Sequence, residues 1–207
     1  MGGTDAVTLG FLGGSFDPPH LGHLIIARDA IEQLGLERVF LIPAMQSPLR
    51  SGSHNATFEQ RLDMCRMLTK GRDWLDVLDI EGYLPAPSYT IHTARKLVEM
   101  FPGASLVWLL GADQWARLPQ WKDYDLLGRM LRFGVAARPG HNIGALPPPS
   151  PEASLIHARN IEISSTELRE RLYCKLPIDH LVPAGVQEYI LKNGLYKHHQ
   201  STHDRSK

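Results

Sequence analysis

The sequence predicts an α/β protein with a doubly wound parallel sheet and a short C-terminal helical segment. Short apolar runs alternate with longer segments in which apolar residues recur every three or four positions, which is typical of repeated βαβ units. One run, SLVWLL at residues 105–110, is continuously apolar, as expected for a central parallel strand buried on both faces. The length of 207 residues suits one sizeable domain, which we expect at residues 1–197.

The first half of the chain predicts three strands separated by two helices. The first strand, VTLGFL, ends at Gly13 and Gly14, and the next segment has an apolar stripe from Leu21 to Leu34 with Gly35 at the C-cap position. The elements that follow are a strand at 39–42 closed by a proline, a polar loop at 44–56, a helix at 58–68 and a strand at 75–80.

The second half continues the alternation and ends in helices. Glycine and proline predict a turn at 82–88, and proline-rich sequence predicts a surface loop at 142–152. The regular elements are a helix at 91–101, strands at 105–110 and 132–140, a strand at about 155–163, and helices at about 165–173 and 183–192. The helical segment covers about 164–196, and the polar tail at 198–207 is expected to be disordered.

The overall charge argues against large polyanionic partners. The chain has 22 Lys and Arg residues and 22 Asp and Glu residues, so its net charge is +0. Nucleic-acid coats and proteins of anionic membrane surfaces usually carry a cationic excess, so we expect neither nucleic acid nor membrane as a partner. A local cationic site remains compatible with this balance.

The cysteines and the N-terminus favour a cytoplasmic protein. Cys65 and Cys174 are far apart and belong to no C-x-x-C pair, which predicts buried free thiols and neither a disulfide framework nor a zinc site. The first residues lack the cationic and apolar regions of a secretory signal, and no apolar stretch is long enough to span a bilayer.

The stretch GGSFDPPHLGHL, residues 13–24, predicts an anion-binding site. It follows a strand and opens a helix, which is where ligands collect in open α/β sheets. The glycines let a ligand approach the backbone, Pro18 or Pro19 suits the first helical turn, and the free amides of that turn attract anions. His20 and His23 are three residues apart, so one helix face carries both rings toward one phosphate. The alternative is a turn with two histidines of the core or surface.

A second stretch, ISSTELRERL at residues 163–172, predicts a capped helix with phosphate-binding potential. Ser164 and Glu167 have the spacing of a capping box, which alone would explain them. The alternative is a second phosphate site, because Ser165 and Thr166 present hydroxyl groups at a helix start and Arg169 follows one turn later.

These two stretches resemble the H-x-G-H and I-S-S-T-x-x-R signatures of the nucleotidylyltransferase superfamily. Within it the chain most resembles the bacterial nicotinate-nucleotide adenylyltransferases, over roughly residues 7–196. Further similar segments are PSYT at 87–90, GAD at 111–113, Trp121 and ARPG at 137–140. The resemblance implies a Rossmann-like fold and transfer of AMP from ATP to nicotinate mononucleotide, giving deamido-NAD and pyrophosphate, with Mg²⁺ carried on the ATP phosphates.

The resemblance also implies roles for single residues. His20 and His23 are expected to contact the ATP phosphates, with His23 acting at the transition state. The other residues expected to bind ATP are Gly13, Gly14, Ser15, Phe16, Arg50, Gly111, Asp113, Ser164, Ser165, Thr166 and Arg169, the last also as a catalytic residue. Those expected to bind the mononucleotide are Ser15, Tyr89, Thr90, Trp121 and Arg138; Trp121 would stack on the pyridine ring, and the amides near Tyr89 and Thr90 would meet the carboxylate.

Two departures and three alternatives accompany this interpretation. Ser15 stands where the family usually has Thr, and QSPLR at 46–50 replaces a loop that usually reads P-x-H-K, so Arg50 would substitute for the basic residue. The alternatives are transfer to nicotinamide mononucleotide, transfer to phosphopantetheine, and a non-catalytic nucleotide-binding module. Because the attacking phosphate oxygen is already anionic, we expect neither a general base nor a covalent nucleophile. No cluster of acidic side chains in the sequence indicates a dedicated metal site. The protein is expected to be a monomer or a small homo-oligomer.

Overall fold

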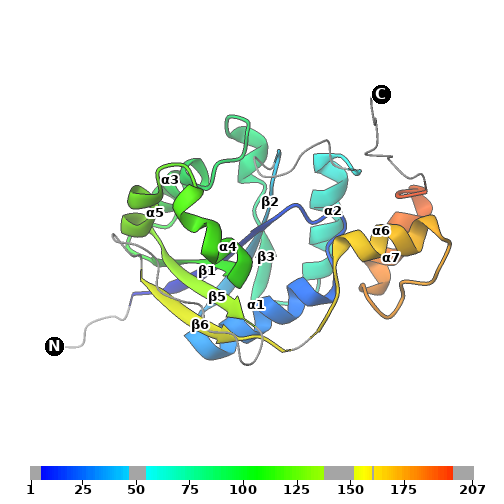
Figure 1. The fold of residues 1–207 in the computed structure, drawn as a ribbon, viewed down its shortest axis with the longest axis horizontal. Coiled ribbons are helices and arrows are strands. Elements are labelled where there is room, and N and C mark those ends of the chain that lie inside the picture. The colour runs from blue at the N-terminus through cyan, green and yellow to red at the C-terminus, as the bar shows by residue number, and fades with distance from the viewer. Residues whose placement is uncertain (1–5, 47–54, 138–151, 160, 198–207) are drawn as a thin grey trace, which may run out of the picture.

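A computed structural model of the chain contains a six-stranded sheet in which all neighbouring strands are parallel (Figure 1). The structure describes residues 6–46, 55–137, 152–159 and 161–197. The strands are β1 (Thr8–Gly14), β2 (Arg38–Pro43), β3 (Leu75–Val77), β4 (Ser105–Gly111), β5 (Arg132–Ala137) and β6 (Ala153–His157). Their spatial order is β3-β2-β1-β4-β5-β6, so the chain winds outward in both directions from β1 and β4. The predicted doubly wound parallel sheet is confirmed.

Alternation along the central strands produces two separate cores. In β4, Val107 and Leu109 belong to one hydrophobic cluster, whereas Leu106, Trp108 and Leu110 belong to the other. This follows from the two-residue period of a strand, which sends successive side chains to opposite faces of the sheet. A central strand covered on both faces therefore needs an unbroken apolar sequence, as predicted for residues 105–110.

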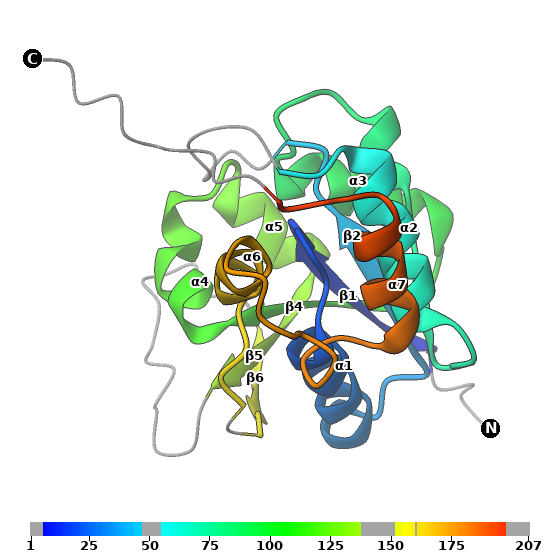
Figure 2. The ribbon, with the colours of Figure 1, turned by 90° about the vertical axis from the view of Figure 1, so that its right-hand side faces the viewer.

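Helices cover both faces of the sheet (Figures 1 and 2). The first core takes its helical residues from α1 (Leu21–Leu34), α2 (Phe58–Thr69), α6 (Ser165–Tyr173) and α7 (Ala184–Lys192). The second core takes them from α3 (Thr90–Met100), α4 (Ala112–Arg117) and α5 (Tyr124–Met130), with the 3-10 turns Ile80–Tyr83 and Leu118–Gln120. The helices predicted at 21–34, 58–68, 91–101, 165–173 and 183–192 are all present.

Two predicted strands are shorter than expected because the chain turns away from the sheet. The strand predicted at 75–80 ends at Val77, and Gly82 N donates to Asp79 O at 3.0 Å, so Ile80 is buried from a 3-10 turn. The strand predicted at 155–163 begins at Ala153 and ends at His157.

The chain after β6 is held by the first helix. Arg159 N donates to Asp29 Oδ2 at 3.1 Å, and the Arg159 guanidinium also contacts that carboxylate. Asp29 is buried in α1, so the segment that follows β6 leaves the sheet and continues along this helix. The prediction of a strand as far as residue 163 is therefore wrong.

The C-terminal helices pack into the first core. Leu168, Val186 and Ile190 are buried in the same cluster as residues of β1, β2 and α2, and Figure 2 shows α7 beside α2. Leu21 N donates to Leu181 O at 3.0 Å, which joins the start of α1 to the segment between α6 and α7. The predicted helical segment therefore lies against the part of the chain that carries the two histidines.

The structure also bears on the predictions about the cysteines, a membrane span and the loops. Cys65 is buried as expected, but Cys174 is exposed at the C-cap of α6, so the prediction of two buried thiols is wrong for Cys174. Among the described residues, no helix is long and apolar enough to cross a membrane. The tail at 198–207, Arg50, Arg138, and most of the loops at 44–56 and 142–152 lie outside the described residues.

Candidate active site

The C-terminal ends of the neighbouring strands β1 and β4 lie at the point where the strand order reverses. β1 ends at Gly13 and Gly14, and β4 ends at Gly111. A Cβ atom on Gly13 would lie 2.5 Å from the Trp108 ring, and one on Gly14 would lie 3.1 Å from the Phe16 ring, so protein side chains fill both spaces. At Gly111, by contrast, no atom of the described chain would lie within 4 Å of a Cβ. Packing therefore requires glycine at 13 and leaves little room for a Cβ at 14, whereas the backbone at the end of β4 is open.

The two histidines form a stacked pair at the start of α1. His20 is the N-cap and His23 is the third residue of the helix, so neither Pro18 nor Pro19 occupies the first turn as predicted. Their ring centroids are 3.8 Å apart with an interplanar angle of 29°, and the buried Phe16 ring meets His23 at 4.8 Å. The predicted proximity of the two rings is confirmed, although His20 lies at the N-cap and not on a face of the helix.

Steric crowding explains why a glycine, Gly22, lies between the two histidines. A Cβ atom at this position would lie 2.9 Å from Nδ1 of His20. That approach is closer than real Cβ contacts allow, so any larger residue would displace the His20 ring. The glycine of the H-x-G-H pattern therefore permits the stacking of the two imidazoles.

Burial keeps both imidazoles neutral. It lowers the pKa of His20 from 6.5 to about 4, and burial followed by the charge of His20 holds the pKa of His23 well below its usual value. The His20 N–H donates to Nδ1 of His23 at 3.2 Å. Because Nδ1 is the acceptor, the neutral His23 ring carries its proton on Nε2, which is thereby a hydrogen-bond donor.

The histidine pair predicts an acid-sensitive free protein. Between about pH 4 and pH 6.5 the unfolded chain binds a proton at His20 that the folded chain does not, so the free energy of unfolding rises as pH rises through this window. The His20 term amounts to roughly 3 kcal/mol across the window. Urea unfolding at pH 4.5 to 7.5 should show this slope, and His20→Gln should flatten it. The exposed His157 offers a control, since an equal flattening in His157→Gln would contradict the assignment.

The second motif starts α6 and bonds to the histidine loop. Ser164 is the N-cap and accepts a hydrogen bond from Glu167 N at 3.1 Å, as the capping interpretation predicted. Ser165 Oγ donates to Pro18 O at 2.8 Å across 147 positions of sequence. The two stretches singled out in the sequence therefore lie together, although the Ser165 hydroxyl already bonds to the protein.

Arg169 makes the second link between α6 and this loop. Its Nη1 donates to Asp17 O at 2.7 Å, and its Nη2 donates to Thr166 Oγ1 at 3.1 Å. The guanidinium of Arg169, which was predicted to clamp a polyphosphate, thus reaches the loop just before the histidines. In this structure its bond to the Asp17 carbonyl holds the loop backbone.

Asp17 is a buried carboxylate that the sequence analysis did not single out. Its side chain has 0% exposure and accepts hydrogen bonds from Asn55 N at 2.9 Å, Ala56 N at 3.1 Å and Tyr196 Oη at 2.9 Å. Two remote segments of the chain, at residues 55–56 and at Tyr196, therefore meet on one carboxylate within the histidine loop. Its place beside the motif was visible in the sequence, but its partners lie far along the chain.

Arg61 is the second functional candidate that was missed. The side chain is fully buried, and it donates to Ser15 O at 2.7 Å and Met45 O at 3.3 Å, so it joins the loop after β1 to the end of β2. A signal was present in the sequence. Arg61 stands four and seven residues before Cys65 and Leu68, on the apolar stripe of its helix, where a charged residue needs an internal partner.

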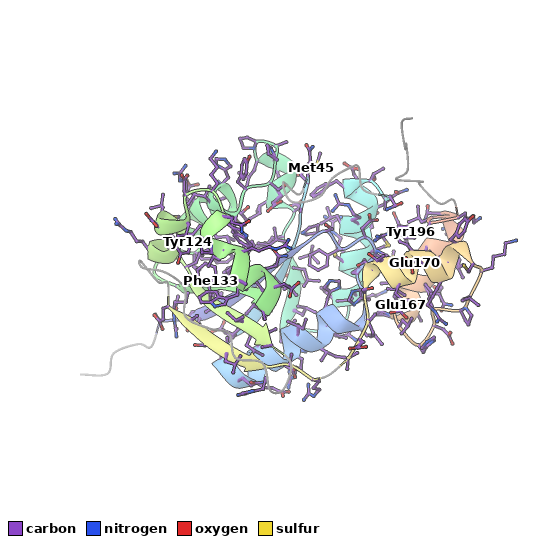
Figure 3. The ribbon with its side chains drawn as sticks, in the orientation of Figure 1. Met45, Tyr124, Phe133, Glu167, Glu170 and Tyr196 are labelled. Atoms are coloured by element: carbon purple, nitrogen blue, oxygen red, sulfur yellow. The ribbon has the colours of Figure 1, made fainter. Side chains whose placement is uncertain are left out.

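Trp121, which was expected to stack on the pyridine ring, lines a separate pocket. A pocket of about 500 Å³ is lined by Arg95, Pro119, Trp121, Asp123, Tyr124, Asp125 and Leu126. Nε1 of Trp121 is buried and has no hydrogen-bond partner among the described residues. Figure 3 shows Tyr124 and Tyr196 toward opposite ends of the long axis, so this pocket is remote from the Asp17 contacts. The structure brings no contact between Trp121 and the histidine pair.

Tyr89 and Thr90 form the start of α3, one residue before the helix predicted at 91–101. Tyr89 is the N-cap and Thr90 is the first helical residue. The Tyr89 amide donates to Pro87 O at 2.8 Å and is thus already bonded. The Thr90 amide belongs to the first turn, whose N–H groups have no acceptor within the helix. Lys122 Nζ lies 4.7 Å from the centre of the Tyr89 ring.

The loop before α3 is tied to the end of β2 by Glu81. Thr93 Oγ1 donates to Glu81 Oε1 at 2.8 Å and Met45 N donates to Oε2 at 3.3 Å. Burial raises the pKa of this carboxyl, although the hydrogen bonds oppose the shift. Ser88 N donates to Gln46 O at 2.8 Å in the same region. These contacts hold the segment that carries Tyr89 and Thr90.

The carboxylates of this region are either hydrogen-bonded or exposed and form no cluster within the described residues. The described residues contain no group of three or more His, Cys, Asp or Glu side chains placed to hold a metal ion. Both oxygens of Asp17 accept protein hydrogen bonds, and Asp113 is exposed in the first turn of α4. Mg²⁺ keeps several waters and takes phosphate ligands readily.

A family model and two relatives similar in sequence all indicate a nucleotidyltransferase. Residues 11–171 match the family model described as cytidylyltransferase-like. Two relatives are each named probable nicotinate-nucleotide adenylyltransferase. The protein of Methylacidiphilum infernorum is 38% identical over 206 residues, covering 98% of both chains, and that of Opitutus terrae is 40% identical over 190 residues, covering 91% of this chain and 97% of its own.

Solved structures share the fold at low sequence identity. One is the nicotinic acid mononucleotide adenylyltransferase of Plasmodium falciparum complexed with NaAD, with a TM-score of 0.73, 20% identity, and coverage of 92% of this chain and 97% of that chain. Another is a putative nicotinate-nucleotide adenylyltransferase from Vibrio parahaemolyticus, with a TM-score of 0.68, 17% identity, and coverage of 89% and 99%.

Proposed function

Because this chain belongs to the cytidylyltransferase-like family and, within it, to the nicotinate-nucleotide adenylyltransferases, we propose that it transfers AMP from ATP to nicotinate mononucleotide. The products are nicotinic acid adenine dinucleotide and pyrophosphate, and the reaction is a step of NAD biosynthesis. The observation that carries the proposal is the union of two remote motifs, through the bonds from Ser165 to Pro18 and from Arg169 to Asp17, at the end of β1. A non-catalytic binding module would not require this full set of groups.

The reaction needs positioning more than acid–base chemistry. A phosphate oxygen of the mononucleotide attacks the α-phosphorus of ATP. One P–O bond forms while the bond from the α-phosphorus to the bridging oxygen of the β-phosphate breaks, and pyrophosphate leaves with the electron pair. The attacking oxygen is already anionic at neutral pH, so no base must remove a proton. Catalysis then depends on alignment and on donors placed where charge accumulates.

The histidine pair supplies such donors without being charged beforehand. Neutral His23 carries its proton on Nε2, because Nδ1 accepts the hydrogen bond from His20 N. In the proposed site this N–H donates to an oxygen of the reacting phosphate, and the negative charge of the triphosphate raises the pKa of both rings toward protonation. The stack holds the two imidazoles in one orientation before ATP binds.

The remaining assignments follow the motifs. Gly111 lies at the open end of β4, which supports a ribose or adenine contact beside Asp113. Trp121 lines the pocket of about 500 Å³ and supports stacking on the pyridine ring, with the Thr90 amide near the carboxylate. The proposed ATP site comprises Gly13, Gly14, Ser15, Phe16, His20, His23, Arg50, Gly111, Asp113, Ser164, Ser165, Thr166 and Arg169, and the mononucleotide site comprises Ser15, Tyr89, Thr90, Trp121 and Arg138.

Mg²⁺ would enter this site on the phosphates of ATP. It would neutralise charge on the β- and γ-phosphates, with phosphate oxygens and water as most of its ligands. The occupied Asp17 carboxylate supports this arrangement, since its oxygens already accept hydrogen bonds from Asn55, Ala56 and Tyr196. The cytoplasmic location and the monomeric or small homo-oligomeric state are also predictions, which cell fractionation and sedimentation would test.

One assay tests the proposed function. Purified protein with ATP and Mg²⁺ should release pyrophosphate when nicotinate mononucleotide is added, and a parallel reaction with nicotinamide mononucleotide should be slower by about tenfold or more, since one mispaired polar group in a binding site costs at least this much. A third reaction with phosphopantetheine should give only background release. Absence of pyrophosphate with every acceptor, in protein that binds ATP, would reject the enzyme.

A further inference from the structure

A tyrosine near the end of the described chain bonds to the carboxylate beneath the histidine loop. Tyr196 Oη donates to Asp17 Oδ1 at 2.9 Å across 179 positions of sequence, and the two side chains have exposures of 7% and 0%. The same carboxylate accepts the amides of Asn55 and Ala56 at 2.9 and 3.1 Å. Asp17 lies three residues before His20, so these contacts act directly on the loop that leads into the histidine pair.

Two residues at this contact have unfavourable backbone conformations. Tyr196 has φ 62°, in the left-handed region, and Phe16, which precedes Asp17, has φ 48°. Residues other than glycine avoid this region because the Cβ atom crowds the backbone. Both ends of the link therefore include a residue held in such a conformation. Strain of this kind persists only where surrounding contacts determine the position of the chain.

The path of the chain explains how Tyr196 reaches this place. After α7, Leu195 N donates to Ile190 O at 3.0 Å, which turns the chain back at the end of the helix. Figure 2 shows the segment after α7, in red, running toward the end of β1, in dark blue. Tyr196 then packs in the first core together with Leu12 and Val186. The hydroxyl group is the polar end of an otherwise apolar contact.

Charge and hydrogen bonding fix the roles of the two groups. Burial, followed by the Asp17 charge, raises the pKa of Tyr196, so the phenol remains a donor at every working pH. Arg61 and Arg169 both act on Tyr196 in the opposite direction, which places two cations near the pair. Arg169 also donates to the Asp17 carbonyl oxygen, so the residue is held through its backbone and its side chain by separate segments.

We propose that Tyr196 is a positioning residue for AMP transfer, holding Asp17 and thereby the path of residues 14–20 that sets the histidine pair against the ATP phosphates. This rests on the proposed function. In this role Tyr196 acts through Asp17 and touches no reacting atom. Its loss would let the loop relax after one hydrogen bond to a buried carboxylate is removed, and small misplacements of reacting groups are costly in rate.

Tyr196→Phe and Tyr189→Phe make a matched pair of variants. Tyr189 Oη, on α7, donates to Asp63 Oδ2 at 3.2 Å, so each variant loses one hydrogen bond from a tyrosine to an aspartate in the same C-terminal segment. Only Tyr196 bonds to the histidine loop. Tyr196→Phe should lower kcat/KM for ATP about tenfold or more, through both a lower kcat and a higher KM for ATP, with KM for nicotinate mononucleotide changed less than twofold. Tyr189→Phe should keep all three constants within twofold.

A second measurement separates this inference from the proposed function. The Kd of a non-hydrolysable ATP analogue should rise about fivefold in Tyr196→Phe and stay within twofold in Tyr189→Phe, because loss of one hydrogen bond to a charged group permits a change of this size. This comparison holds even if nicotinate mononucleotide proves to be the wrong acceptor. An unchanged kcat/KM and Kd in folded Tyr196→Phe, or equal losses in both variants, would overturn the proposal.

Asp17→Asn tests whether Tyr196 acts through the Asp17 carboxylate. If Tyr196 acts through the Asp17 carboxylate, adding Tyr196→Phe to Asp17→Asn should cost less than a further twofold in kcat/KM, since residues of one network are not additive. Full additivity of the two losses would show that Tyr196 acts by another path and would reject the proposal. Near-ultraviolet circular dichroism of each variant checks that the chain is folded.

Discussion

Replacing His23 with alanine is expected to lower kcat for pyrophosphate release by about 10²–10³-fold. Removal of one donor that stabilises charge in a transition state has effects of this size. KM for ATP should change far less, because the interaction strengthens as the bond to the leaving pyrophosphate breaks. Stopped assays of pyrophosphate release at saturating ATP measure the effect, and thermal unfolding checks that the variant folds.

Two amide variants separate the two nitrogens of His23. Asparagine can place an oxygen near the position of Nδ1 and accept the hydrogen bond from His20 N, but it has no group at the position of Nε2. Glutamine extends an N–H toward the Nε2 position. His23→Gln should therefore retain more activity than His23→Asn, whereas His157→Ala at an exposed site should resemble the parent protein. Equal activity in His23→Ala and the parent would contradict the role of this imidazole.

The sheet was predictable because its strands carry their own signals. Residues 105–110 form an unbroken apolar run, and β4 is buried on both faces as that run requires. The five helices that the sequence predicts have apolar stripes of two turns or more. The missed helices α4 and α5 have only 6 and 7 residues, too few for a three- to four-residue period to repeat. Their positions follow from tertiary packing, of α4 on β4 and β5 and of α5 on α3.

The location of the site could be predicted from the sequence, but most of its hydrogen bonds could not. The sequence indicated the stretches at 13–24 and 163–172 as candidate phosphate sites, and the structure joins them through Ser165 and Arg169. It did not indicate that these side chains bond to the carbonyls of Pro18 and Asp17. Such bonds depend on where the backbone runs after folding, and no local pattern encodes them. The bond from Tyr196 to Asp17, across 179 positions of sequence, could not be predicted for the same reason.

Arg61→Met is expected to lower the free energy of unfolding by about 3 kcal/mol or more, the cost of removing one partner from a buried charged network. Methionine fills much of the same space but has no donor, so the carbonyls of Ser15 and Met45 each lose a buried hydrogen bond. For a chain of this size the melting temperature should fall by roughly 6–12 °C. Arg61→Lys should recover only part of the loss, because one ammonium cannot reproduce the planar fork that reaches both carbonyls.

Arg66→Met is the matched control on the same helix. Arg66 is exposed and lies 3.3 Å from Asp63, an exposed ion pair worth at most about 1 kcal/mol. Since Arg61 also fixes the loop that leads to the histidines, Arg61→Lys should raise the Kd of an ATP analogue while Arg66→Met leaves it unchanged. Comparable stability losses in Arg61→Met and Arg66→Met would show that the buried guanidinium contributes no more than a surface charge. Its two carbonyl contacts would then not be what holds the strand ends of β1 and β2 together.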